Sequence, residues 1–233
     1  YNTVLGASAG ASITTATNNI AIGYQTLDNE TTGVDNVAIG SSALGAQQGA
    51  NNNTAVGRSA GGNITTGEQN TVIGSNALLT NTVGDRSVAV GYATLYYQNP
   101  SSNVDMYNTA VGYNAGAGVT TGTQNTFVGG LAGDSMTTGQ GNTGIGMNAL
   151  TQVTTAGYNT AVGWNAGDAL TTGTGLVAVG TNAAGALTTG EDSTGIGYQA
   201  LANKTTASNN TAVGMNSLAG AGSGSENTAV GKT

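Results

Sequence analysis

Cysteine and histidine are both absent from this chain of 233 residues, and proline occurs once, at Pro100. Without cysteine and histidine the chain has no disulfide, thiol nucleophile or imidazole base, and the commonest zinc ligands are missing. Adjacent Glu191 and Asp192 are a poor pair for glycoside hydrolysis, because neighbouring strand residues point to opposite faces. We therefore expect no enzymatic activity, no cofactor and no metal site.

Charge is also scarce, with eleven acidic and four basic residues and a net charge of -7. The four basic residues are Arg58, Arg86, Lys204 and Lys232, and they do not form the cluster that a nucleic-acid surface needs. No apolar run approaches the ~20 residues of a membrane-spanning helix, and the N-terminus does not read as a signal peptide. Nucleic acid and membrane insertion are therefore not expected.

Glycine is abundant, with 40 residues, and the sequence repeats itself. The segment NTAVG at 108–112 recurs at 159–163, 210–214 and 227–231. Such spacing indicates a repeat architecture. The period is 17 residues, and the repeats start at Asn2, Asn19, Asn36, Asn53, Asn70, Ser87, Asn108, Asn125, Asn142, Asn159, Leu176, Ser193, Asn210 and Asn227.

The repeats cover the chain without a break, so we expect a single array over 1–233. The repeat that starts at Ser87 has four extra residues, which predicts a loop insertion around 96–107. Because the chain begins with Tyr1 rather than Met, we expect it to be a fragment of a longer fibre.

Three positions of the repeat predict a short β-strand. The second is β-branched in all fourteen copies, the fourth is always aliphatic, and the fifth is always glycine, from Gly6 to Gly231. β-Branched residues favour strands, and glycine after the strand permits a turn or a close backbone approach. A recurring TTG, as at 31–33, predicts a second short strand. The predicted fold is all-β, a β-solenoid (β-roll) of 17-residue coils.

The third position lies on the opposite face from the second and fourth. It is small and apolar nearly throughout, and we expect it to face outward. An exposed strip of this kind is larger than monomers usually tolerate, so it predicts a subunit interface, for which threefold packing is one closed arrangement. The candidate interface residues are Ala21, Ala38, Ala55, Ala89, Ala110, Phe127, Ala161, Ala178, Ala212 and Ala229.

The ninth and twelfth positions vary together. A Leu at the ninth accompanies a polar or small twelfth, as in Leu27/Glu30 and Leu218/Ala221, whereas a Gly or Ala at the ninth accompanies a large aliphatic twelfth. Leu150/Val153 is the exception. This pattern indicates one core space that either position can fill. We expect the aliphatic twelfth residues Ile13, Ile64, Val119 and Leu170 to be buried, and the polar ones Glu30, Asn81 and Lys204 to be exposed.

Repeats such as NTAVGYNAGAGVTTGTQ (108–124) and STGIGYQALANKTTASN (193–209) resemble those of bacteriophage tail fibres and of trimeric autotransporter adhesin heads. The resemblance covers the whole chain. It implies a left-handed β-roll assembled as a parallel homotrimer, located extracellularly on a virion or cell surface. It also implies a structural fibre segment that acts as a rigid spacer and attaches to a host surface.

Aromatic residues follow the invariant glycine or lie near the insertion, where side chains are free to contact a glycan or protein receptor. The candidate surface contacts are Tyr24, Tyr92, Tyr96, Tyr97, Tyr107, Tyr113, Trp164 and Tyr198. The alternative interpretation is a monomeric ice- or polysaccharide-binding solenoid, since regular outward Thr can order surface water. The column of Asn at the first position indicates a structural amide ladder. Asp28, Asp134 and Asp168, all at the tenth position, are interpreted as solvated turn acids rather than calcium ligands.

Overall fold

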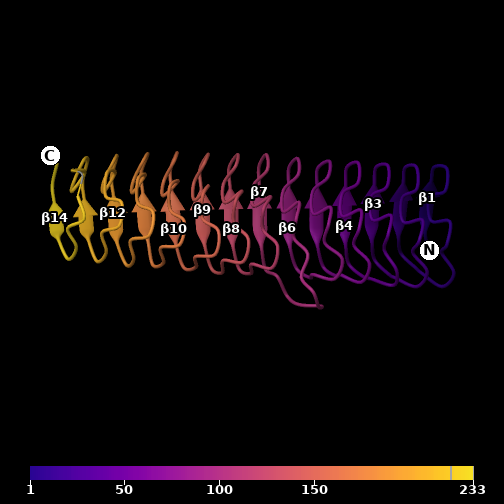
Figure 1. Cartoon of the computed structure of the whole chain (residues 1–233). Helices are drawn as coiled ribbons and strands as arrows, with labels where there is room; N and C mark the ends of the chain where they lie inside the picture. Colours follow the sequence, from indigo (N-terminus) through magenta and orange to yellow (C-terminus); the bar gives the residue numbers. More distant parts are fainter. Residues whose placement is uncertain (221, 233) are drawn as a thin grey trace. The chain divides into compact units, whose positions relative to one another are not determined.

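A computed structural model describes residues 1–220 and 222–232. The chain forms an all-β parallel β-solenoid in which each repeat is one coil and carries one strand of three residues (Figure 1). The described residues contain no helix. Two compact units divide the chain, unit 1 from Tyr1 to Thr121 and unit 2 from Gly122 to Thr233.

Within each unit the strands pair in parallel and in sequence order, so that equal repeat positions lie side by side, as in Ala38↔Ala55. The strands of unit 1 are β1 (Thr3–Leu5), β2 (Ile20–Ile22), β3 (Val37–Ile39), β4 (Thr54–Val56), β5 (Thr71–Ile73), β6 (Val88–Val90) and β7 (Thr109–Val111). Those of unit 2 are β8 (Thr126–Val128), β9 (Thr143–Ile145), β10 (Thr160–Val162), β11 (Val177–Val179), β12 (Thr194–Ile196), β13 (Thr211–Val213) and β14 (Thr228–Val230).

The glycine at the fifth position ends each strand for two reasons, which Gly74 illustrates. Its φ is +134°, in a region that side chains rarely adopt, and a Cβ there would lie 2.2 Å from the carbonyl oxygen of Gly91 in the next coil. Its N–H donates to the carbonyl of Val56 in the previous coil at 2.8 Å. Only glycine combines this φ with so close a backbone approach.

The prediction of which strand face points outward is wrong. The third position points inward: of the candidate interface residues, all but Ala229 are buried within their own chain, and Ala229, in β14, is half-buried. The second and fourth positions are partly or fully exposed in every strand. The alanine column is therefore core and not a subunit interface.

The physical reason is the narrow interior of the coil. One strand side chain per coil points inward, where it meets buried residues of the eighth and ninth positions, such as Ala43 and Leu44. Phe127 is the large exception, and its ring occupies the space where a Cβ on Gly133 or Gly144 would lie. Two β-branched residues per strand do not fit such a space, whereas one alanine does.

The TTG segments are bends and not a second strand. In Thr65–Thr66–Gly67, the backbone N–H of Thr65 donates to the carbonyl of Thr82 in the next coil at 2.9 Å, and its hydroxyl donates to the same oxygen at 3.0 Å. The first threonine of the segment thus links two successive coils, because its N–H and its hydroxyl donate to the same carbonyl oxygen. Each coil has one strand, and the rest of its backbone is turns and bends.

The expected exposure of polar residues at the twelfth position is also wrong. Ile64, Val119 and Leu170 are buried as expected, while Ile13, in the first coil, is half-buried; Glu30 and Asn81 are as buried as Ile64, and Lys204 is half-buried. The shared core space is real, because a Cβ on Gly61 would meet the Ile64 side chain at 2.9 Å. The side chains of Glu30 and Asn81 instead turn toward the neighbouring bend and bond to its backbone. Ala221, the counterpart of Leu218 in this pattern, lies outside the described residues.

The amide ladder predicted at the first position is confirmed. The N–H of Asn36 donates to Asn19 Oδ1 at 2.9 Å, and Asn36 Nδ2 donates to the carbonyl of Ala50 at 2.8 Å. The same pattern runs through unit 2, where the N–H of Asn142 donates to Asn125 Oδ1 at 3.0 Å. Each buried amide therefore satisfies backbone groups of its own turn and of the next coil.

The insertion leaves the strand register unchanged. β6 and β7 pair as Val88↔Thr109 although 21 residues separate them instead of 17. Tyr96 and Tyr97, at the tenth and eleventh positions of the repeat, still follow the path of the regular coil, since the N–H of Tyr97 donates to the carbonyl of Ala117. The chain departs from the regular coil after Asn99, whose N–H donates to the carbonyl of Thr120.

Candidate functional site

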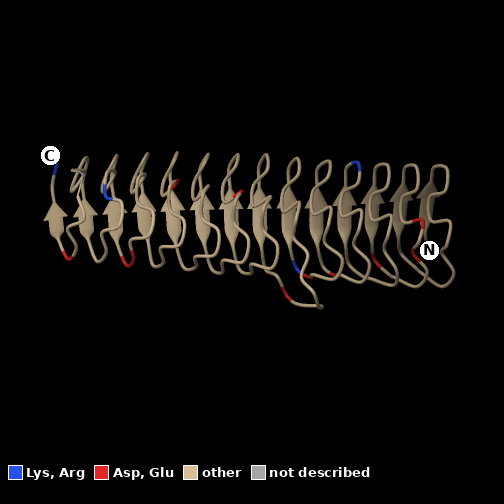
Figure 2. Cartoon of the chain, in the orientation of Figure 1, with Lys and Arg blue, Asp and Glu red and all other residues tan. Residues whose placement is uncertain are grey.

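The outer face of the strands forms a regular surface along each unit. It consists of the second-position and fourth-position side chains, for example Thr109 and Val111 on β7. No strand contains a charged residue, and Figure 2 shows the charges of the described chain outside the strands. Thr, Val and Ile therefore form two adjacent columns that are partly exposed along each unit.

The candidate aromatic contacts are all at least partly exposed, but they do not form one site. Tyr92, Tyr96, Tyr97 and Tyr113 line one pocket. Tyr107 lies instead in a polar cluster with Arg86. The three others, Tyr24, Trp164 and Tyr198, are about half exposed, and none of them lines that pocket.

The pocket has a volume of about 280 Å³ and lies at the corner of two successive coils. The rings of Tyr92 and Tyr113 stack with centroids 5.6 Å apart and planes 9° apart. Tyr96 and Tyr97 contact each other edge to face, with centroids 4.7 Å apart. Ala93, Asn114 and Ala117 complete the lining, so none of the seven lining residues is charged.

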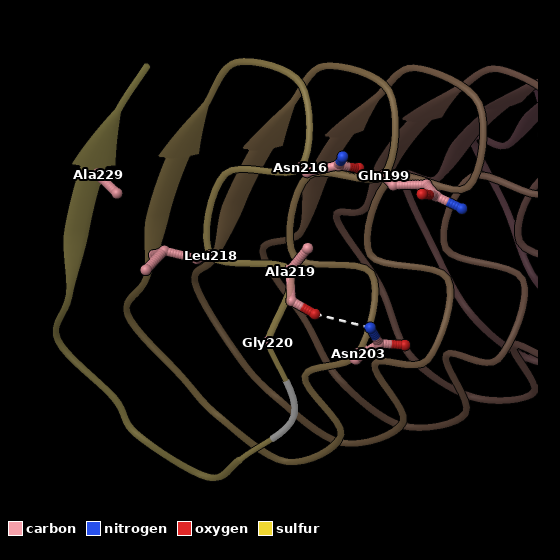
Figure 3. Close-up of a pocket in the computed structure, with 7 residues that line it drawn as sticks. All are labelled: Gln199, Asn203, Asn216, Leu218, Ala219, Gly220 and Ala229. Atoms are coloured by element: carbon pink, nitrogen blue, oxygen red, sulfur yellow. Dashed lines mark hydrogen bonds between the residues drawn. The ribbon is translucent and has the colours of Figure 1, made fainter. Parts of the chain in front are cut away.

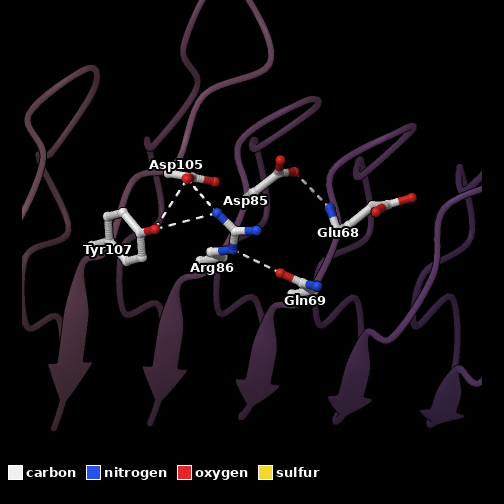
Figure 4. Close-up of polar contacts among 6 residues, drawn as sticks. All are labelled: Glu68, Gln69, Asp85, Arg86, Asp105 and Tyr107. Carbon is white, nitrogen blue, oxygen red and sulfur yellow. Dashed lines mark hydrogen bonds and ion pairs between the residues drawn. The ribbon is translucent and has the colours of Figure 1, made fainter.

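A polar cluster surrounds the base of the insertion (Figure 4). Arg86 pairs with Asp105, contacts the Tyr107 hydroxyl at 3.2 Å, and donates from Nε to Gln69 Oε1 at 2.7 Å. The Tyr107 hydroxyl also donates to Asp105 at 3.0 Å. The hydrogen bond with Tyr107, followed by the charge of Asp105, raises the pKa of Arg86. The polar groups of Arg86, Asp105 and Tyr107 thus find partners within the cluster, and these contacts hold the insertion onto the coil.

Two further pockets lie in unit 2. One, of about 600 Å³, opens beside β14, where Asn203 Nδ2 donates to the Ala219 carbonyl at 2.7 Å (Figure 3). Leu218 and Ala229 line it, and both hold inward positions of their coils. This pocket therefore exposes core positions of the coil rather than a set of functional side chains.

The other pocket of unit 2, of about 280 Å³, is polar and contains the carboxylate of Asp168 beside Asn182 and Gln199. Partial burial raises the pKa of Asp168, and it does the same to the pKa of Asp134 at the same repeat position. No group of three or more acidic side chains that could hold a metal ion occurs in the described part of the chain. In that same part, no helix has the length and apolarity of a membrane span.

All three pockets occupy the same place in the repeat. The pocket of unit 1 and both pockets of unit 2 are lined by seventh-position residues, such as Asn114 and Gln199, and by tenth-position residues, such as Ala117 and Ala202. The corner of the coil brings these positions together. Sequence analysis found the tyrosines but missed Asn114, because the repeat columns do not show which positions meet across a corner.

No protein-family model matches the chain, and neither a curated protein nor a solved structure matches it. The likeness of the repeats to those of fibres and adhesins thus stays a prediction.

Proposed function

We propose that the protein is a structural segment of an extracellular fibre, of the phage tail-fibre or bacterial adhesin kind, located on a virion or cell surface. In this proposal three parallel copies pack through the outer faces of their strands. The segment acts as a rigid spacer and as an attachment region for a cell-surface glycan or protein receptor. Its role is mechanical and requires no catalysis.

The observation that supports the proposal is the uncharged, largely aliphatic outer face. Seven strands at ~4.8 Å spacing, with two outward residues on each, give roughly 300 Å² of surface in each unit. That is at the lower end of the roughly 300–600 Å² that the largest surface patch of a monomeric protein reaches, and such patches are often functional. Fourth-position residues such as Ile73, Ile145 and Ile196 remain about 40% exposed, so a second copy of the face would remove aliphatic surface from water.

The first test is the absolute solution mass, measured by light scattering. The proposal predicts about three times 22.6 kDa. In a double variant, Ile39→Lys with Val56→Lys, buried charge at the shared face should reduce the mass to that of one chain. The matched control, Ser41→Lys with Ser75→Lys, places the same charges at the corner and should keep the trimer. A monomeric parent chain would contradict the trimer.

The same face also supports a second candidate function. Thr and Val or Ile stand side by side on it, as Thr109 and Val111 do on β7, at regular spacing. A regular uncharged face left open in a monomer suits binding to an ordered surface, either ice or a polysaccharide. If the mass is that of one chain, thermal hysteresis and polysaccharide pull-down are the experiments that test this alternative.

A further inference from the structure

We infer that the tyrosine pocket of unit 1 binds one sugar ring of a neutral glycan. The pocket is lined by Tyr92, Ala93, Tyr96, Tyr97, Tyr113, Asn114 and Ala117. The inference rests on the attachment role proposed above. It does not require the trimer, since one chain supplies every residue of the pocket.

The two stacked rings form an aromatic platform. Tyr92 and Tyr113 hold the same position in successive coils, and their planes are nearly parallel. The preceding coil has Ser75 at this position, and the N–H of Ala93 donates to the Ser75 carbonyl at 3.1 Å. No third ring therefore continues the stack on that side, and the aromatic surface offered to a ligand is that of the four tyrosines that line the pocket.

The platform is held by a rigid corner. The N–H of Asn114 donates to the carbonyl of Tyr92 at 3.0 Å, and that of Leu95 donates to the carbonyl of Ala115 at 3.1 Å. Ala93, which lines the pocket, is buried, and so are Leu95 and Ala115 of the same two coils. Because the backbone below the rings is fixed in both coils, little conformational entropy is lost when a ligand binds.

The lining matches the chemistry of a pyranose. A sugar ring has a C–H face, which packs on an aromatic face, and hydroxyl groups, which need hydrogen-bond partners. The tyrosine hydroxyls and the Asn114 amide can supply those partners, and the described structure shows no hydrogen bond of the Asn114 side chain. The volume of about 280 Å³ is near the lower end for small-molecule sites, roughly 300 Å³.

Charge favours a neutral glycan over an anionic one. None of the seven lining residues carries a positive charge to pair with a carboxylate or sulfate, and the whole chain carries a net charge of -7. An anionic sugar would lose hydration in the pocket without gaining an ion pair. A cationic ligand would find no carboxylate among the lining residues.

The experiment is saturation-transfer difference NMR with the full chain and five probes. These are the methyl glycosides of glucose, galactose, mannose and N-acetylglucosamine, with N-acetylneuraminic acid as the anionic comparison. At least one neutral glycoside should receive saturation on its ring C–H protons. Tyr92→Ala and Tyr113→Ala should each reduce that signal at least fivefold, whereas Tyr92→Phe should retain it within about twofold, because the ring face remains.

The matched control is Tyr24→Ala, which removes a tyrosine of the same repeat position and similar exposure outside the pocket. It should leave the signal unchanged, and circular dichroism should confirm that every variant keeps its β-structure. The inference is overturned if no neutral glycoside receives saturation, if Tyr92→Ala and Tyr113→Ala retain it, if Tyr24→Ala loses it equally, or if N-acetylneuraminic acid gives the stronger signal.

The outcome of the glycoside experiment is independent of the solution mass that tests the fibre proposal. A trimer that binds no neutral glycoside removes the sugar site and leaves the fibre proposal intact. A monomer that binds one through Tyr92 and Tyr113 keeps the sugar site and removes the trimer.

Discussion

Glu30 carries the only carboxylate among the fully buried side chains of the described residues. Its Oε1 accepts the backbone N–H groups of Thr32, Gly33 and Gly49, and its Oε2 accepts Gln47 Nε2 at 2.8 Å. The carboxylate thus satisfies backbone groups of two successive coils. Removing it would leave several buried donors without an acceptor, each at a cost of about 1–3 kcal/mol.

We therefore predict that Glu30→Ala lowers the free energy of unfolding by about 3 kcal/mol or more, measured by urea denaturation. Glu191→Ala is the control, because Glu191 is exposed, and it should change the free energy by less than about 0.5 kcal/mol. Equal effects of the two substitutions would contradict the structural role of Glu30.

Asp168 gives a prediction on pH. Partial burial raises its pKa above the ordinary value of 3.8, so the folded chain holds the proton more tightly than the unfolded chain does. Its contribution to stability is therefore fully present below pH 3.8 and is lost as pH rises through the folded pKa. Asp168→Asn should be more stable than the parent chain at pH 7, and the difference should shrink toward pH 3. Thermal melts at both pH values measure it; a parent chain that is the more stable at pH 7 would contradict the assignment.

At the scale of the element, the strand depends on the glycine that follows it. Gly74→Ala would force a Cβ against the Gly91 carbonyl at an unfavourable φ, and we expect a loss of about 2–5 kcal/mol in unfolding free energy. Gly130→Ala is the matched control, since a Cβ there would meet no atom within 4 Å. Urea denaturation of the two variants tests this prediction. Similar losses of unfolding free energy in both would show that the close backbone approach at Gly74 is not what makes glycine necessary there.

The elements also show which parts of the fold the sequence could reveal. The 17-residue period, the strand and the glycine after it were predictable, because each depends on local backbone preference. The face that points inward was not predictable. A three-residue strand such as TAV has uncharged, largely apolar residues on both faces, so no charged side chain identifies the exposed face. The width of the coil interior decides which face points inward, and that width is known only from the closed coil.

The burial of Glu30 and the composition of the tyrosine pocket were missed for a related reason. A charged residue in a repeat column ordinarily indicates an exposed position, but the bend beside Glu30 offers several N–H groups that face inward. The tyrosines were identifiable as surface residues. That four of them share a pocket with Asn114 follows from the corner, which brings seventh and tenth positions of successive coils together.

At the scale of the whole molecule, the coils within each unit are hydrogen-bonded to their neighbours in the repeat order, so stability within a unit should be transmitted only from coil to coil. We predict that Gly74→Ala weakens amide protection in β4, β5 and β6 while leaving β10 to β12 of unit 2 at parent values. Hydrogen exchange followed by mass spectrometry measures this. A uniform loss of protection over both units would contradict the prediction and indicate one cooperative unit.

The insertion has a consequence for engineering. The sheet keeps its pairing from Val88 to Thr109 across the added residues, and the residues from Ser101 to Asp105 are exposed. Extra length in the insertion is therefore not passed on to the coils beside it. The insertion offers a place to graft a foreign epitope, which the scaffold would display without a change in its own backbone.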